Sequence, residues 1–509
     1  MLKRYLSLLL CTVLSGSLLA HKQPTTPTPL AQEAWSLYNP LRQWSAGSSL
    51  HNPALRYYLP QPTLTLVQLT AYSQRAQQVR VQQLGDRHRF FSLEAQSLIP
   101  LSSSSLVWGG ASYHKGKKTS IRFNNTSDTQ LLYPYLLADD KGGFMDYETY
   151  QFQGGYLHHF SAAYTLGVEL DYRAKVAYRD KDPRPKNTVS DLAFRLGGSK
   201  EISSYTLGLA GYLQKYQQDN DIQFVSELNV RPIYHLSGLG MRAIRFDGSS
   251  YRTQYDAWGY GGALAFQSQQ AEGWKAEVTY GVFEFDKLLN DLNDLTLQSL
   301  KEQKASGLLA YQERRWAVQA SAQWKKRSGT ENLFGTAEGG HYPVIGKEKP
   351  YQHQVKEARL QGIWKLAQGQ TELYLSPSLG YRQSKESYKD PQRYLKRSSL
   401  MPSLSSYLRH ATAQAGIFSL EAGIRGNFKL SASSRVDELA SSAVLYPLMQ
   451  EARQLLVQKE IAGLAAIRWD LPFRLFQSTE LFLQADWETL SLSHYKPLHQ
   501  AQLTLGFLF

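Results

Sequence analysis

The sequence predicts an all-β fold, a large antiparallel transmembrane β-barrel of about 18 to 20 strands with a short N-terminal extension or plug. Three observations predict it: an N-terminal secretory signal, long segments in which apolar and polar residues alternate, and an amphipathic final segment that ends on Phe509. Outside the signal the 509-residue chain has no run of about 18 apolar residues, which excludes a helical membrane span. Its 12% aromatic content, including 32 Tyr, suits strands with one apolar face.

Residues 1–20 have the three parts of a secretory signal peptide. Lys3 and Arg4 supply positive charge, an apolar run follows, and small residues lead to Ala20. We therefore expect cleavage after export, and a location in the outer membrane of a Gram-negative bacterium. The single cysteine, Cys11, lies in this segment, so the mature chain is expected to have no disulfide and no thiolate metal site.

Residues 21–60 do not join the alternation that follows. The prolines between Pro24 and Pro29 indicate a stiff, extended linker. Residues 34–58 are interpreted either as a small plug or inner-wall segment, or as a disordered periplasmic tail. The barrel itself is assigned to residues 61–509.

The clearest alternation runs from Tyr164 to Arg179. Apolar and aromatic residues from Tyr164 to Tyr178 share one face, and helical spacing would scatter the opposite set around a cylinder. That opposite face carries the charged residues predicted to face the lumen: Glu169, Asp171, Arg173, Lys175 and Arg179. These charges could form a transverse field that selects polar solutes, or they could form salt bridges along the wall of a filled barrel.

A second segment indicates depth in a membrane. Trp316, Val318, Ala320, Ala322 and Trp324 alternate with polar or small residues. The two Trp are separated by roughly 26 Å along a strand, or roughly 20 Å of height after a tilt of about 40°. This spacing fits two interfacial aromatic girdles, to which we assign Trp316, Trp324, Tyr164 and Tyr178.

A count of strands back from Phe509 gives about 20, including segments at 221–235 and 239–248. It places long connections 327–350 and 431–452 outside and turns at 470–472 and 367–369 inside. At the C-terminus, Leu505, Phe507 and Phe509 share a face and resemble the signal by which the barrel-assembly machinery recognises such proteins.

The net charge is +13, and 54 − 43 = +11 remains once Lys3 and Arg4 are removed. No nucleic-acid motif accompanies it, so we expect lumen walls or loops that meet lipopolysaccharide or anionic solutes. The connection Asp182-Pro183-Arg184-Pro185 could bind an anionic ligand or lipid headgroup, or form a rigid turn whose Arg and Asp pair locally. The histidines have no metal-ligand spacing, and no metal or cofactor is expected.

Residues 85–240 resemble an uncharacterised family of outer-membrane barrels typical of Bacteroidetes. The resembling residues are Gly85-Asp86-Arg87, Tyr133-Pro134-Tyr135-Leu136, Phe152-Gln153-Gly154-Gly155-Tyr156, Tyr178-Arg179-Asp180, Asp182-Pro183-Arg184-Pro185 with Asn187, and Tyr234-His235 with Gly238-Leu239-Gly240. The resemblance implies a barrel fold, an outer-membrane location and proximity to TonB-dependent receptors, but no catalytic residues.

The leading functional hypothesis is a passive or accessory transport protein for small polar solutes, since a barrel of this size can hold an aqueous passage. The alternative is a plugged barrel that acts through its long loops as a binding or assembly partner of a receptor or lipoprotein. An enzyme is not expected, because no Gly-x-Ser-x-Gly motif occurs.

Overall fold

The computed structural model describes residues 29–41, 51–160, 163–226, 230–270, 272–412, 415–436, 443–476 and 479–509. The predicted signal peptide, residues 1–20, lies outside the described residues. None of the described helices is long and apolar enough to cross a membrane.

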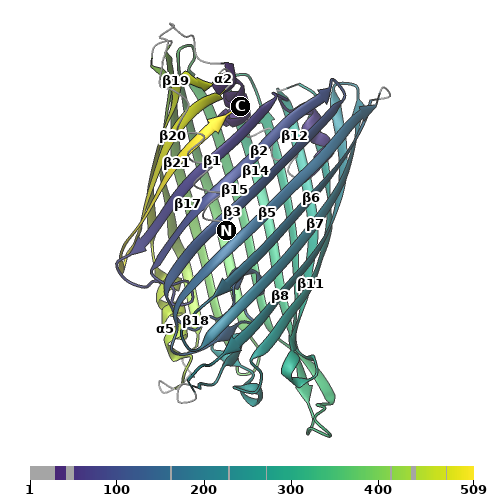
Figure 1. The fold of residues 1–509 in the computed structure, drawn as a ribbon, viewed down its shortest axis with the longest axis vertical. Helices are drawn as coiled ribbons and strands as arrows, with labels where there is room; N and C mark the ends of the chain where they lie inside the picture. The colour runs from purple at the N-terminus through teal and green to yellow at the C-terminus, as the bar shows by residue number, and fades with distance from the viewer. Residues whose placement is uncertain are drawn as a thin grey trace.

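Eighteen antiparallel strands form one closed barrel, and pairing of β1 with β21 joins the two ends of the sheet (Figure 1). The predicted fold class is therefore confirmed. The wall strands are β1 (Leu64–Ala76), β2 (Arg87–Ser102), β3 (Ser105–Ile121), β5 (Gly143–Phe160), β6 (Tyr164–Tyr178), β7 (Arg184–Ile202), β8 (Tyr205–Gln223), β11 (Arg252–Ser268), β12 (Gly273–Leu289), β13 (Leu295–Gln312), β14 (Trp316–Phe334), β15 (Val344–Ala367), β16 (Thr371–Tyr388), β17 (Arg393–Thr412), β18 (Gly416–Arg435), β19 (Glu460–Phe476), β20 (Thr479–Leu492) and β21 (Tyr495–Leu508).

The two ends of the barrel differ. Short turns and the C-terminus lie at one end, which we call the terminal end, together with α2 (Pro29–Tyr38). The longer connections lie at the other, which we call the loop end, and include α5 (Tyr446–Val457) and η5 (Asn290–Leu292). The predicted turn at 367–369 is confirmed, because β15 ends at Ala367 and β16 begins at Thr371.

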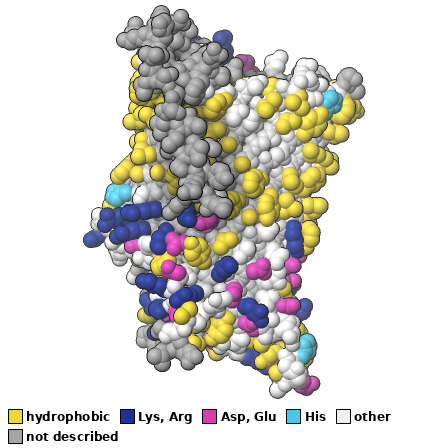
Figure 2. Space-filling view, viewed as in Figure 1, with side chains coloured by type: hydrophobic (Ala, Val, Ile, Leu, Met, Phe, Trp, Pro, Cys, Tyr) yellow, Lys and Arg dark blue, Asp and Glu magenta, His cyan; other side chains and the backbone are white. Residues whose placement is uncertain are grey.

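Period-two alternation gives each wall strand an outer and an inner face. In β6, Tyr164, Leu166 and Val168 are 43%, 54% and 38% exposed on the outside. Thr165 and Glu169, on the inside of the same strand, are buried. Figure 2 shows hydrophobic side chains over the half of the wall near the terminal end and charged side chains toward the loop end. The strands therefore extend beyond an apolar belt into a charged zone.

The predicted strands at 221–235 and 239–248 are wrong as wall strands, which explains why the barrel has 18 strands and not 20. After β8 the chain leaves the wall and forms β9 (Tyr234–Gly238), β10 (Met241–Arg242) and η4 (Ile244–Phe246). β9 pairs with β10 and with β4 (Leu137–Ala138) in a separate small sheet. All five residues of β9 are buried, because both of its faces meet protein and neither meets lipid.

The predicted turn at 470–472 is also wrong. These residues lie within β19, which continues to Phe476. Its pairing with β20 shifts register between Asp470 and Arg474. Pro472 has no backbone N–H for the ladder, and an irregularity of this kind accommodates it without ending the strand.

Candidate functional site

Two loop-end connections fold back into the lumen. We call residues 122–142 and the described residues 224–226 and 230–251 the inner loops; the first contains α4 (Thr129–Leu132) and β4, and the second contains β9, β10 and η4. They form the largest described apolar core together with inward side chains of the wall and with α5. Its fully buried members include Phe123, Leu132, Tyr135 and Leu136 of the first inner loop and Tyr351 of β15. The loop end of the lumen is thus filled with packed protein.

Donors from the wall satisfy the backbone carbonyls of the first inner loop. The Arg327 guanidinium donates to the carbonyls of Gln130 and Tyr133 at 2.9 and 2.8 Å. The Tyr255 hydroxyl donates to the carbonyl of Tyr135 at 2.6 Å. A loop buried in a lumen leaves carbonyls that no sheet satisfies, and an unpaired buried carbonyl is costly. These bonds therefore fix the loop in place.

Strand β6 and Arg179, the residue that follows it, supply ionic contacts to the same loop. Arg173 and Lys175 contact Asp128 at 2.7 and 3.1 Å, and Arg179 contacts Asp139 at 3.1 Å. Burial alone would raise the pKa of Asp128, but the positive charges of Lys175 and Arg173 outweigh it and lower that pKa to about 2. Asp128 is therefore ionised and bound to the wall at all physiological pH values.

The half of β6 nearer the terminal end contacts the N-terminal segment. Glu169 accepts hydrogen bonds from Arg56 in η2 (Pro53–Tyr58) at 3.2 Å, from Trp108 Nε1 at 2.9 Å and from Arg195 at 2.7 Å. Asp171 accepts from the Gln151 amide at 3.3 Å. All five charged residues predicted on this strand thus lie on the lumen side with protein partners. Their influence on solutes stays a prediction.

Glycines make room for η2 on the wall. A side chain at Gly167 would meet the backbone of Pro53 and Ala54 at 2.7 Å, and one at Gly197 would meet the Asn52 amide oxygen at 2.0 Å. Asn52 caps η2 by accepting from the Ala54 N–H and donates to the carbonyl of Gly198 at 3.1 Å. Because Gly167 and Gly197 have no side chain, η2 can pack directly against the backbone of the wall.

Helix α2 lies against the opposite part of the wall. The Glu480 carboxylate accepts from the Ala31 N–H at 2.7 Å, and Trp35 Nε1 donates to Glu372 at 3.1 Å. The Trp35 ring stacks on Tyr407 with centroids 5.3 Å apart and has the Arg409 guanidinium 4.8 Å from its centroid. The described N-terminal residues thus line the inner wall at the terminal end.

Two cavities lie in the lumen beside the N-terminal segment, and we call them the chamber. The first, about 600 Å³, is bordered by Pro40 and has amide and hydroxyl side chains from seven wall strands: Gln68, Gln96, Gln361, Gln484, Ser376, Ser405, Ser419, Tyr374 and Tyr407. The second, about 500 Å³, is bordered by Arg56 and shares Leu66 and Gln96 with the first. Charge in the first cavity is limited to Glu421 and Arg468, and Arg468 forms an ion pair with Asp470 at 2.7 Å. The polar side chains that line the first cavity are thus mostly uncharged, whereas the second cavity is also lined by Arg56, Glu94 and His114.

The remaining predicted site residues lie outside the chamber. Tyr164 and Trp316 begin their strands at the terminal end, and Trp324 stands farther along β14. Tyr178 has Asp146 and Lys186 as cross-strand neighbours, so it stands in the charged zone.

Two other predicted sites, the loop motif at Asp182–Pro185 and the C-terminal residues, also lie outside the chamber. Arg184 donates to Asp182 at 2.8 Å, and Asp182 also accepts from the Val225 and Ser226 N–H groups. These backbone bonds, followed by Arg184, lower the pKa of Asp182. Pro183 and Pro185 flank Arg184. Leu505 and Phe507 pair with Leu69 and Val67 of β1, and Phe509 is 45% exposed.

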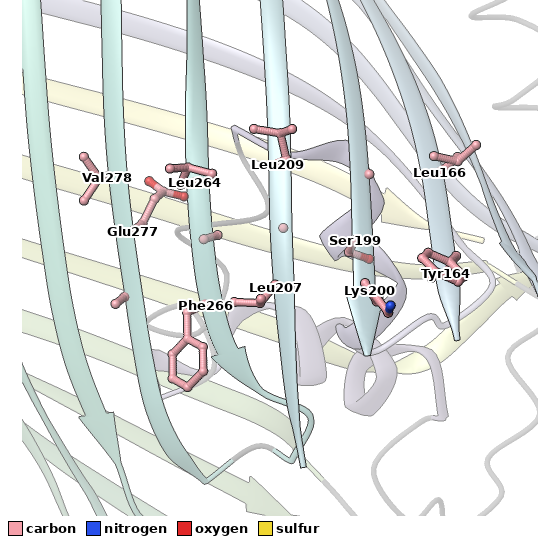
Figure 3. A pocket seen from close by; sticks show the side chains of 14 residues that line it. Tyr164, Leu166, Ser199, Lys200, Leu207, Leu209, Leu264, Phe266, Glu277 and Val278 are labelled. Carbon is pink, nitrogen blue, oxygen red and sulfur yellow. The ribbon is translucent and has the colours of Figure 1, made fainter. Parts of the chain in front are cut away.

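A further apolar hollow of about 620 Å³ lies on the outside of the wall, over β6, β7, β8, β11 and β12 (Figure 3). Leu166, Leu209, Leu264 and Val278 border it and are 54% to 64% exposed. It belongs to the apolar belt and not to the chamber. Within the described residues no cluster of three or more His, Cys, Asp or Glu side chains could hold a metal ion.

Reasoning from the sequence missed the inner loops. One signal was available: the count of strands places strands at 103–114 and 145–159, which leaves residues 115–144 as a connection much longer than usual, and such connections are often functional. The apolar run Leu131–Ala138 inside it has no alternation, as expected for a segment buried on all sides.

Comparison with known proteins identifies the family. The model of a family described as "Family of unknown function (DUF6850)" matches residues 53–509. The chain belongs to this family. No curated protein matches the chain.

Several solved barrels are distantly similar. The siderophore receptor PiuA from Acinetobacter baumannii is 9% identical with a TM-score of 0.38, over 87% of this chain and 82% of that chain. A mutant ferric enterobactin receptor PfeA from Pseudomonas aeruginosa, in complex with enterobactin, is 9% identical with a TM-score of 0.40, over 91% and 85%. OccK9 (OpdG) from Pseudomonas aeruginosa is 11% identical with a TM-score of 0.34, over 88% and 98%. Similarities this distant transfer no ligand or mechanism.

Proposed function

We propose that this barrel spans the outer membrane and transports small, neutral polar solutes through a lumen that the inner loops close at rest. The membrane location is supported by the closed wall, which leaves no sheet edge in lipid, and by the apolar belt. In barrels of this kind both termini normally face the periplasm, so the terminal end is assigned to the periplasm and the loop end to the exterior.

The main support for this proposal is the set of side chains that line the chamber. Amides and hydroxyls both donate and accept hydrogen bonds, so the walls of the 600 Å³ cavity can replace the hydration of a neutral hydroxylated solute. Most lumen charges described above are paired within the protein, which leaves little fixed charge to attract an ion. Closure by packed loops implies that transport requires displacement of the first inner loop from β6.

Swelling of proteoliposomes in a neutral disaccharide tests this function. We expect slow swelling for the wild type and fast swelling for a variant in which a Gly-Ser linker replaces residues 124–138. In that variant, Gln361→Trp should narrow the chamber and slow the uptake, whereas Val318→Trp on the outer face should not. A loop-shortened barrel that inserts correctly but remains impermeable to the sugar would refute the transport function.

A specific observation also favours the second function, a binding partner in the outer membrane. Ile345, Val344 and Leu333 of the β14–β15 hairpin are 70%, 49% and 42% exposed, and Ile244 of the second inner loop is 68% exposed. Arg245 bonds to the carbonyl of Gly335, so these apolar side chains belong to one region of the loop end. Apolar side chains exposed beyond the lipid belt are typical of protein interaction sites.

Photo-crosslinking in intact membranes tests the partner function. A crosslinker at Ile345 should capture one discrete protein, and Ile345→Asp should abolish a complex that survives mild detergent. A crosslinker at the exposed Leu209 of the lipid belt serves as the control position. Equal, diffuse labelling from both positions would argue against a partner.

A further inference from the structure

Basic side chains gather on the outside of three neighbouring strands near the loop end. We call Arg75 of β1, Arg87 and Arg89 of β2, and Lys115 and Lys117 of β3 the basic cluster. The side chains of Arg87, Lys115 and Lys117 are 45%, 61% and 47% exposed. Figure 2 shows Lys and Arg side chains at the left edge, where Figure 1 places the loop ends of β1 and β2.

The strand register brings like charges opposite one another. Arg75 pairs with Arg87 across β1 and β2, and Arg89 pairs with Lys117 across β2 and β3. Side chains directly opposite in a sheet are about 5 Å apart, and like charges at that distance are destabilising. A wall that keeps two such pairs side by side therefore favours a bound anion.

Local carboxylates neutralise only part of the cluster. Lys115 pairs with Glu148 at 2.6 Å, Lys117 with Asp146 at 3.3 Å, and Arg87 with Asp86 at 3.9 Å. Within the described part of the chain, no carboxylate forms an ion pair with Arg75 or Arg89. Elsewhere on the outer wall, by contrast, Lys215 pairs with Asp256 and Lys301 with Glu284.

An apolar groove adjoins the basic cluster on the side of the lipid belt. It has a volume of about 470 Å³ and is bordered by side chains from β1, β2 and β19–β21, among them Leu69, Ala71, Phe91, Trp469, Leu483 and Leu503. Leu503 and Phe91 are 64% and 48% exposed.

Strands β1 and β2 contribute side chains to both the groove and the basic cluster. Given a rise of about 3.3 Å per residue, Ala71 and Arg75 are about 13 Å apart along β1, and Phe91 and Arg89 are about 7 Å apart along β2. An apolar groove thus continues directly into a site with unneutralised guanidinium groups.

We propose that the basic cluster and the groove together bind a phosphorylated glycolipid of the outer leaflet. Its phosphates lie on Arg75 and Arg89, and its acyl chains lie in the groove. Guanidinium groups bind phosphate oxygens in a bidentate manner, and two of them on separate strands suit a headgroup with two phosphates better than one with a single phosphate. The inference rests on the proposed orientation, which puts the loop end of the wall in the outer leaflet.

Native mass spectrometry of the full-length barrel tests the site. The protein is incubated with lipid A carrying two phosphates, lipid A carrying one, or phosphatidylglycerol. We expect preferential retention of the first, and a drop in its occupancy of about tenfold in Arg75→Gln/Arg89→Gln, since bonds to charged groups are strong. The control Lys215→Gln/Lys301→Gln removes the same outward charge and should retain the lipid. Equal retention by both double variants would overturn the proposal.

Two further measurements distinguish a site for the lipid from a site for a free anion. Ala71→Trp fills the groove and should weaken retention, whereas inorganic phosphate at millimolar concentration should not displace the lipid. Displacement by phosphate together with full retention by Ala71→Trp would reveal a simple anion site and would refute the glycolipid site. Heat-modifiable mobility in gels verifies that each variant is folded. Because sugar uptake is measured separately, loss of this site and loss of transport are distinguishable.

Discussion

Removal of one carboxylate, Asp128→Asn, should release the first inner loop from the wall. Asp128 is 12% exposed and bonds to Arg173 and Lys175. Its pKa is lowered from 3.8 to about 2, so its ionised form is favoured in the closed state by about 2 to 3 kcal/mol. Arg173 keeps Asp191 as a second partner at 3.0 Å, which limits the loss to this range. The open fraction should therefore rise by about 30- to 160-fold.

The sign of the pH dependence follows from the lowered pKa. The stabilisation from Asp128 is fully present above about pH 4 and is lost as the pH falls toward 2. The wild type should therefore open more often in strongly acidic buffer, and Asp128→Asn should show no such dependence from this group.

Single-channel recording in planar bilayers measures the effect. The matched control is Asp140→Asn in the same loop, because Asp140 pairs with Arg231 at 3.5 Å near the surface, where ion pairs contribute little. We expect frequent openings for Asp128→Asn and wild-type behaviour for Asp140→Asn. If Asp128→Asn stays as closed as the control, or if the wild type is already open most of the time, then the contacts between β6 and Asp128 do not hold the first inner loop in the closed state.

Three further predictions concern other parts of the chain. Burial raises the pKa of Glu451 in α5 to about 7, although the hydrogen bond from the Gln82 N–H favours the ionised form. Burial of this carboxyl group should therefore destabilise the packing of α5 as the pH rises from 4.5 through 7; faster hydrogen exchange in α5 at pH 8 than at pH 5, absent in Glu451→Gln, would show this. Gly167→Val should displace η2 and expose residues 51–63 to protease, whereas Gly154→Val, with no atom within 4 Å, should not. Phe509→Ala should lower the yield of folded barrel in membranes severalfold, and an unchanged yield would contradict an assembly role.

The sequence alone determined the wall. Side chains alternate from Tyr164 to Arg179 because successive residues of a strand point to opposite faces of the closed sheet, one apolar and outside, the other inside. This rule depends only on neighbouring residues in the chain. It therefore predicted the barrel, and it assigns Glu169 and Arg173 to the inner face. The same rule failed for β9, because a segment inside the lumen has no lipid face and no reason to alternate.

Only the tertiary structure decided what fills the lumen. Asp128 meets Arg173 and Lys175, and Arg56 meets Glu169, across 45, 47 and 113 residues of chain. Such contacts depend on which wall strands enclose the same space, and no local pattern carries that information. Local alternation set which residues face inward, whereas packing between distant segments closed the loop end and left a polar chamber beneath it.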